Sequence, residues 1–333
     1  MKSGGRMLLT ASALAATLMG TSACVHSAVF NARVEDNYPA AGTLVPVNGH
    51  DVHVLRAGED GPPVLMIHGA SANAREYSWS LAPRLSSDHR VFMADRPGHG
   101  YSERPPNGEQ LGVQADQMAG ILAAFAPEEP AIVVGHSFGG AVALRLALDH
   151  PERVKALVLS APVSHDWGGG GEAWYNEYAS RPVLGHVFTQ LVPLVGPSVS
   201  KNGVRNVFSP APAPDNYYEN SAIALLFRPP NFRANSRDVS ALRGEVQAQQ
   251  DRYDTLAMPI VVFSGAGDTV IKPQLHVGQL KHQAQNLTLV ALPHEGHMPH
   301  HGEGAAMADA IRRLAQGLSP QTPQTVAIGA GPE

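Results

Sequence analysis

Residues 132–141 read IVVGHSFGGA, and this stretch decides the fold. An apolar run typical of a buried strand leads into Gly-His-Ser-Phe-Gly, and a helical run of small residues, 138–149, follows. Gly135 and Gly139 stand two positions before and after Ser137, where a sharp strand-to-helix turn leaves no room for bulk. Such a turn lifts the hydroxyl above the sheet edge and points the amide end of the helix toward it. An ordinary tight turn is the alternative, but the flanking strand and helix favour a nucleophilic serine.

Short apolar runs alternate with longer helical patterns around this stretch. The expected strands are 43–47, 50–56, 64–68, 90–94, 131–135, 156–160, 260–264 and 287–292. The expected helices are 74–86, 110–126, 138–149, 273–283 and 305–317. From residue 64 onward the runs are rich in Val, Ile and Leu, which is typical of buried parallel strands. The alternation predicts an α/β fold with a mostly parallel sheet of eight strands, covered by helices on both faces.

One long segment interrupts this alternation. Between residues 160 and 260 no run resembles a buried strand, and the segment is rich in aromatic residues and proline. A structureless loop of that length is improbable inside a compact domain. The sequence therefore predicts a mainly helical cap, residues 163–255, inserted between two parts of the core, 43–162 and 256–318.

A serine hydroxyl needs an adjacent base, and the base needs an acid that orients it. Asp268 follows an apolar run and a Gly-containing loop, and is expected to orient the base; an ordinary turn residue is the alternative. Gly296-His297 follows the last predicted strand, which makes His297 the expected base. The order serine, acid, histidine along the chain is also the order found in folds that carry this Gly-x-Ser-x-Gly turn.

Two backbone amides are expected to stabilise the negative charge of a tetrahedral intermediate. The N–H of Phe138 directly follows the predicted nucleophile, and the N–H of Ala70 lies in the loop after the strand 64–68. These two groups form the predicted oxyanion hole. His68-Gly69, just before Ala70, also fits a simple strand end.

Four histidines within residues 294–301 invite a metal interpretation. No second cluster of Asp or Cys has ligand spacing, so we expect no metal and no cofactor. His294 is a weaker candidate for the base. His300 and His301 are expected to be surface or helix-start residues.

The N-terminus has the three parts of an export signal: Lys2 and Arg6, an apolar run over residues 7–19, and small residues up to Cys24. Residues 1–24 are therefore predicted to be a signal peptide and residues 25–42 a tether. Thr21-Ser22-Ala23-Cys24 resembles a bacterial lipobox, except that Thr21 replaces the usual aliphatic residue. The resemblance implies a lipid on Cys24 and a periplasmic or membrane-anchored lipoprotein. Simple secretion and a cytosolic enzyme with a disordered or amphipathic N-terminus are the alternatives.

Composition limits the class of partner. The net charge is −5, and removal of residues 1–24 leaves 22 basic against 29 acidic residues, so no basic surface for nucleic acid is expected. The tail, 319–333, contains three prolines and no apolar periodicity, and is predicted to be disordered.

Together these motifs resemble the α/β-hydrolase family, and its subgroup of serine-dependent esterases, lipase-like enzymes and carbon–carbon bond hydrolases. Residues 95–102, DRPGHGYS, also match the family's Asp-x-x-Gly-x-Gly-x-Ser loop. Epoxide hydrolases and haloalkane dehalogenases carry Asp where this chain has Ser137. Proline iminopeptidases carry His-Gly-Gly-Pro-Gly where this chain has His-Gly-Ala-Ser-Ala, residues 68–72.

The resemblance implies acyl transfer through Ser137, His297 and Asp268, with a small or medium apolar carboxylic ester as the first substrate class. Cleavage of a carbon–carbon, lactone, thioester or amide bond by the same residues stays open, as does perhydrolase activity. A non-catalytic, surface-anchored binding protein on the same scaffold is a further alternative.

Overall fold

A computed structural model describes residues 3–170 and 173–319, with residues 3–19 described by their backbone alone. One sheet of eight strands runs through the molecule in the order β1-β2-β4-β3-β5-β6-β7-β8. β1 and β2 are antiparallel to their neighbours, and the other six strands are parallel. The strands are β1 Thr43–Val47, β2 His50–Ala57, β3 Pro63–Ile67, β4 Arg90–Ala94, β5 Ala131–His136, β6 Val154–Ser160, β7 Ile260–Gly265 and β8 Leu287–Leu292. The predicted fold class is confirmed.

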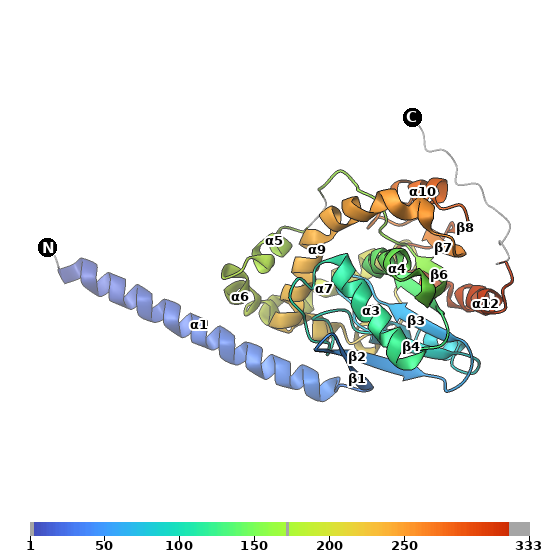
Figure 1. The fold of residues 1–333 in the computed structure, drawn as a ribbon. Coiled ribbons are helices and arrows are strands. Elements are labelled where there is room, and N and C mark those ends of the chain that lie inside the picture. Colours follow the sequence, from blue (N-terminus) through green and yellow to red (C-terminus); the bar gives the residue numbers. More distant parts are fainter. Residues whose placement is uncertain (1–2, 171–172, 320–333) are drawn as a thin grey trace.

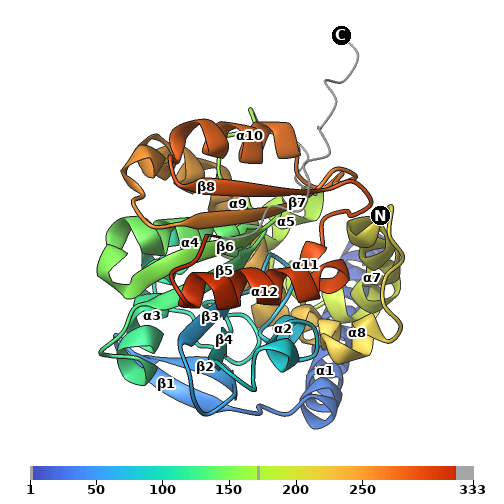
Figure 2. The same ribbon diagram turned by 90° about the vertical axis from the view of Figure 1, so that its right-hand side faces the viewer.

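Helices cover both faces of this sheet (Figure 2). One apolar cluster joins one sheet face to the helices α3 Leu111–Phe125, α4 Phe138–Asp149 and α10 Pro273–Gln283. A second cluster joins the opposite face to α2 Arg75–Ser78, η1 Ala82–Arg84 and α12 Gly304–Ala315. Because neighbouring residues of a strand point to opposite faces, Leu65 and Ile67 belong to the first cluster and Val64 and Met66 to the second. The alternating side chains of β3 thus contribute to both apolar clusters, one on each face of the sheet.

The expected helix over residues 74–86 is wrong as a single element. The structure has two short pieces, α2 and η1, with residues 79–81 between them. Pro83 lies in η1, and a proline ring collides with the carbonyl four residues earlier, here that of Trp79. A continuous helix is therefore excluded.

Between β6 and β7 the described residues form helices only. They are α5 Trp174–Ser180, α6 Leu184–Thr189, α7 Val192–Phe208, α8 Tyr217–Asn220, η3 Ile223–Phe227, α9 Pro229–Gln249 and η4 Gln250–Thr255. A further short helix, η2 Pro151–Arg153, lies just before β6. α9 begins at two prolines, which suit the first turn of a helix because its N–H groups have no partner there. Cap residues Phe208, Tyr217, Phe227 and Phe232 share an apolar cluster with Met298, next to the predicted base. The segment 163–255 thus lies over the edge where the site is expected.

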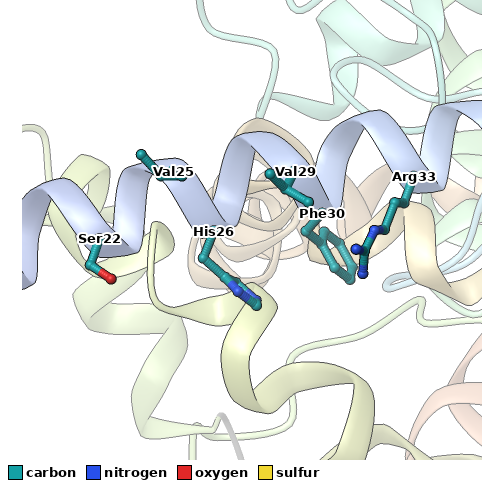
Figure 3. Close-up of a pocket in the computed structure, with 6 residues that line it drawn as sticks. All are labelled: Ser22, Val25, His26, Val29, Phe30 and Arg33. Carbon is teal, nitrogen blue, oxygen red and sulfur yellow. The ribbon is translucent and has the colours of Figure 1, made fainter.

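Of the segments predicted as signal peptide and tether, residues 3–37 form one helix, α1 Ser3–Asn37, which projects from the rest of the molecule (Figure 1). Its C-terminal half packs on the cap: Val34 is buried against Ala222 and Leu225, and Glu35 forms an ion pair with Arg228 at 3.0 Å. Figure 3 shows one face of α1, where six residues line a shallow cavity: Ser22, Val25, His26, Val29, Phe30 and Arg33. No helix among the described residues combines the length and apolarity that crossing a bilayer requires.

A further expectation concerns the C-terminal end of the chain. The predicted disordered tail lies, from residue 320 onward, outside the described residues. One more short helix, α11 Pro299–Gly302, lies directly before α12. Cys24 is exposed on α1 and is the only cysteine of the sequence, so it has no disulfide partner within the chain.

Candidate active site

Ser137 lies at the turn between β5 and α4 in a conformation that L residues rarely adopt, with φ 51° and ψ −115°. The backbone holds it there: its N–H donates to Ser160 O at 3.0 Å, and its carbonyl accepts from Val163 N at 3.1 Å. Such a conformation costs about 1–3 kcal/mol and persists only where the surroundings impose it. The end of β6 and the segment directly after it therefore hold Ser137 in a backbone conformation that this residue would not adopt on its own.

Gly139 explains how closely the turn packs. A Cβ built on this residue would lie 2.2 Å from Ile67 O and 2.6 Å from His68 O, both backbone atoms of the neighbouring strand and loop. A side chain at this position would therefore push α4 away from β3. The missing side chain lets the start of α4 lie against the loop that carries Ala70.

His297 and Asp268 come together at the same sheet edge. His297 Nδ1 lies 2.7 Å from Asp268 Oδ2, and both side chains are buried. The other carboxylate oxygen of Asp268 accepts the N–H groups of Val270 and Ile271, at 2.8 and 3.1 Å. Asp268 is thus both a turn residue and the partner of the imidazole. Because Nδ1–H donates to the carboxylate, Nε2 is left as the proton acceptor that a general base needs.

The structure brings Ser137 and His297 to the same place but does not join them by a hydrogen bond. The residue before the serine, His136, has its ring 4.9 Å from that of His297, and His136 Nε2 donates to His297 O at 2.8 Å. The loop that carries His297 therefore rests on the residue next to Ser137. In the absence of substrate, hydrogen bonds of this kind are often long and tighten only in the reacting complex.

The cap also holds the loop of the predicted base. His297 N–H donates to Val207 O of α7 at 3.0 Å, and a Cβ on Gly296 would lie 2.1 Å from Ser209 O. Gly267 N–H donates to Glu295 O at 3.0 Å, which joins the acid loop to the base loop. Sequence reasoning did not predict these backbone contacts, because neither partner carries a recognisable motif.

The two predicted oxyanion donors lie at a helix start and in the loop after β3. Phe138 is the first residue of α4, so its N–H has no acceptor within the helix. The carbonyl of Gly69 accepts from His68 Nδ1 and from Arg96 Nη2, at 2.8 and 3.2 Å. Since a trans peptide places its C=O and N–H on opposite sides, these bonds turn the Ala70 N–H away from Arg96. No described residue accepts a hydrogen bond from it.

Arg96 connects these parts and was not predicted to do so. Its guanidinium is fully buried, lies 4.1 Å from the centre of the Phe138 ring, and donates to the carbonyls of His68 and Gly69. It also forms an ion pair with Asp238 of α9 at 2.7 Å. One side chain thus links both oxyanion segments to the cap. Arg96 stands inside the DRPGHGYS loop, so its place was marked by the sequence although its partners were not.

His68 belongs to the same network. Its Nε2 accepts from Arg96 N at 3.0 Å, and its Nδ1 donates to Gly69 O. Burial, together with the charge of Arg96, lowers the pKa of His68 to about 3, so the ring stays neutral and keeps this arrangement. His68 and Gly69 therefore not only end the strand but also form hydrogen bonds with Arg96 that fix the oxyanion loop.

Asp95 and Asn235 fix the remaining side of the loop. Asp95 accepts from Ala74 N, Tyr101 N and the ring of His53, at 2.7, 3.0 and 2.7 Å. Burial alone would raise the pKa of Asp95, but these hydrogen bonds outweigh it and hold the pKa below its usual range. Asn235 of the cap accepts from Ser71 N at 2.6 Å, and no sequence motif marks that residue.

His300 and His301 lie at the start of a helix, as one of the two expected alternatives had it, but their side chains are not at the surface. Both lie in α11, and Glu76 of α2, 224 and 225 residues earlier, accepts a hydrogen bond from each of them. The side chains of Glu76 and His300 are fully buried and that of His301 is nearly so. Residue spacing could not reveal this contact because the two segments meet only through the sheet.

A larger cleft lies beside the cap, at the loop after β4. Its volume is about 700 Å³, and its lining includes four arginines, Arg104, Arg228, Arg233 and Arg237. Three of them form ion pairs with acidic residues: Arg104 with Glu109 and Asp238, Arg237 with Glu109, and Arg228 with Glu35. Ser137, Asp268 and His297 are not among its lining residues, so this cleft is distinct from the candidate site.

We expect Arg96→Met to lower the free energy of unfolding by about 3–5 kcal/mol, because it leaves a buried carboxylate and two carbonyls short of a donor. Urea unfolding measures this, and Arg153→Met is the control, because partly exposed Arg153 makes one exposed hydrogen bond to Pro127 O. The double variant Arg96→Met/Asp238→Leu should lose less than the sum of its single changes. An Arg96→Met protein as stable as the wild type would contradict the linking role.

Comparisons with known proteins identify the family of the chain. The family model described as alpha/beta hydrolase fold matches residues 62–303. A 2-hydroxymuconate semialdehyde hydrolase from Pseudomonas sp. (strain CF600) is 32% identical over 264 residues, which cover 75% of this chain and 90% of that protein.

Solved structures share the fold. A bacterial membrane phospholipase A matches with a TM-score of 0.67 and 20% identity, over 95% of this chain and 99% of that one. An esterase from Exiguobacterium antarcticum matches with a TM-score of 0.64 and 18% identity, over 83% of this chain and all of that one. On the strength of the family model and the 32% identical relative, the chain belongs to the alpha/beta hydrolase fold family.

Proposed function

We propose that this protein is a serine hydrolase that works by acyl transfer, with Ser137 as nucleophile, His297 as base and Asp268 as the acid that orients the base. The observation that carries the proposal is the buried 2.7 Å contact between His297 Nδ1 and Asp268 Oδ2, beside a serine in a strained turn. Membership of the alpha/beta hydrolase family supports it. Acyl transfer by these three residues uses only side chains, backbone N–H groups and water, so the proposed reaction requires no metal or cofactor.

In the proposed reaction His297 Nε2 takes the proton of the Ser137 hydroxyl while the oxygen attacks the carbonyl carbon of the substrate. Asp268 stabilises the imidazolium that forms, and the N–H groups of Phe138 and Ala70 bind the oxyanion. The imidazolium then gives its proton to the leaving group, which departs and leaves an acyl group on Ser137. Water, deprotonated by His297, hydrolyses that acyl-enzyme and restores the serine.

An apolar carboxylic ester is the substrate class that the surroundings favour. Met298, next to the predicted base, is packed in an apolar cluster with Phe208, Tyr217 and Phe232 of the cap. A substrate group bound beside this cluster would be shielded from water and would meet aliphatic and aromatic side chains, which favours an apolar substrate. The esterase of similar fold is consistent with this class.

Hydrolysis of a carbon–carbon bond is the second candidate, and one observation favours it. The 2-hydroxymuconate semialdehyde hydrolase resembles this chain over 90% of its own length. Both reactions need the same three residues, so the geometry of the site alone does not separate them. Lactone, thioester or amide hydrolysis would use the residues in the same way.

Ser137→Ala and His297→Ala are expected to lower kcat by about 10⁶-fold, and Asp268→Ala by about 10⁴-fold, because the first two take part directly in bond making. A chromogenic ester measures kcat. A fluorophosphonate should label one serine per chain in the wild type and none in Ser137→Ala. Undiminished hydrolysis by Ser137→Ala would refute the assignment, and folded wild type that resists labelling would favour a non-catalytic binding protein.

A substrate panel separates the two candidate reactions. We expect p-nitrophenyl esters of increasing acyl length to be hydrolysed with a kcat/KM that rises with chain length until the apolar pocket is filled. Ring-cleavage products of catechols serve as carbon–carbon substrates in the same assay. A kcat/KM for the ring-cleavage product that exceeds that for every ester by tenfold or more would favour the second candidate.

We also propose that the protein is exported and anchored through a lipid on Cys24. The contacts of α1 with the cap support this, because Phe30, Val34 and Glu35 all follow Cys24 and would stay in a chain that begins there. Cys24 is exposed and therefore accessible to modification.

Mass spectrometry of the protein purified from membranes of a bacterial host is expected to show a chain that begins at Cys24 and carries acyl groups. A Cys24→Ser variant should appear in the soluble fraction with no lipid. An unprocessed N-terminus at Met1 would contradict export, and processing without lipid would show simple secretion.

A further inference from the structure

The cluster of Glu76, His300 and His301 takes no part in the proposed reaction. The side-chain ligand atoms of these three residues all lie within 4.8 Å of one another. His300 Nε2 is 3.1 Å from Glu76 Oε1, and His301 Nε2 hydrogen-bonds to the same oxygen. The donors are therefore two imidazole nitrogens and one carboxylate, a set that zinc and other first-row transition metals prefer.

The charge of the cluster needs compensation. The side chain of Glu76 is fully buried, and among the described residues its ion-pair partners are the two histidines, with no lysine or arginine. An ionised carboxylate in an apolar interior is costly unless a cation accompanies it. A divalent metal ion would supply that charge.

The atoms around the three donors are arranged as an outer shell. His300 Nδ1 lies 3.3 Å from Ser160 Oγ, so the imidazole can donate there while Nε2 faces Glu76. The hydroxyl of Tyr217 donates to the second carboxylate oxygen of Glu76, Oε2, at 2.8 Å. Ligands in metal sites are oriented by hydrogen bonds of this kind.

An apolar shell surrounds His301. The ring centres of Trp79, Phe208 and Tyr217 lie 4.9, 5.3 and 5.3 Å from that of His301. Tetrahedral zinc at about 2.0–2.1 Å from each ligand needs ligand separations of about 3.3 Å. Small side-chain rotations that lengthen the two contacts of Glu76 with His300 and His301 would therefore admit the ion, which replaces those two hydrogen bonds.

We propose that Glu76, His300 and His301 form a structural binding site for a divalent transition metal ion, zinc in the first place. The ion would connect α2, in the segment after the oxyanion loop, to α11, which directly follows the loop of His297. The ring of His300 is 4.5 Å from that of His136, and His136 Nε2 donates to the carbonyl of His297. The metal would thus hold the loop of the base in place without contacting the substrate.

The test uses the full chain purified without a histidine tag, treated with chelator, incubated with zinc chloride and freed of unbound zinc. Elemental analysis by mass spectrometry is expected to find one zinc per chain. Glu76→Gln and His301→Gln should each retain less than a fifth of that zinc. His294→Gln is the matched control, because His294 is an exposed histidine of the same segment, and it should retain all of it.

Thermal unfolding of the wild type gives a readout that needs no variant. Zinc added to chelator-treated protein should raise the Tm by several degrees, and this rise should be lost in Glu76→Gln. A folded wild type that holds no zinc and shows no change in Tm would overturn the proposal and leave a hydrogen-bonded His-Glu-His network. Equal zinc content in the wild type and both ligand variants would place the metal elsewhere and also overturn it.

Discussion

The strained turn at Ser137 is the constraint on which the rest of the structure depends. A residue with φ 51° and ψ −115° persists only if its neighbours oppose relaxation, and here β6 and the segment after it hold both backbone groups of the serine. The start of α4 then lies against the carbonyls of Ile67 and His68, which is possible because Gly139 has no side chain. The same packing presents the free N–H groups of the helix to the serine.

Contacts from both the core and the cap hold the oxyanion loop and the loop of His297 in position. Arg96, in the core, donates to the carbonyls of the oxyanion loop and forms an ion pair with Asp238 of the cap. Two further cap residues accept hydrogen bonds from the core: Asn235 from the N–H of Ser71, and Val207 from the N–H of His297. A cap that were only a cover could move without disturbing the reacting groups. Here its movement would strain both the oxyanion loop and the loop of the base, so cap position and site geometry are physically coupled.

Histidines next to the site divide into two kinds. His297 faces a carboxylate on one side and keeps Nε2 free, as a base must. His136 and His300 are buried with their rings in tilted contact, and burial lowers the pKa of both, that of His300 to about 4. Neutral rings of this kind pack and donate hydrogen bonds rather than carry protons. The segment 294–301 thus provides a proposed reacting residue and a proposed metal site within a few positions.

The sequence by itself determined the architecture: apolar runs of four to eight residues alternating with helical patterns predict the strand positions, and the Gly-x-Ser-x-Gly turn predicts the nucleophile. These signals are local, because the period of the apolar residues and the need for glycine act over a few residues. The roles predicted for Ser137, Asp268 and His297 rest on the same local signals. Only the tertiary structure decided the partners of Arg96, the contact of Asn235 with Ser71, and the meeting of Glu76 with His300 and His301. Those contacts join segments up to 225 residues apart, and their residue types occur at many positions, so nothing in the local pattern marks which pairs will meet.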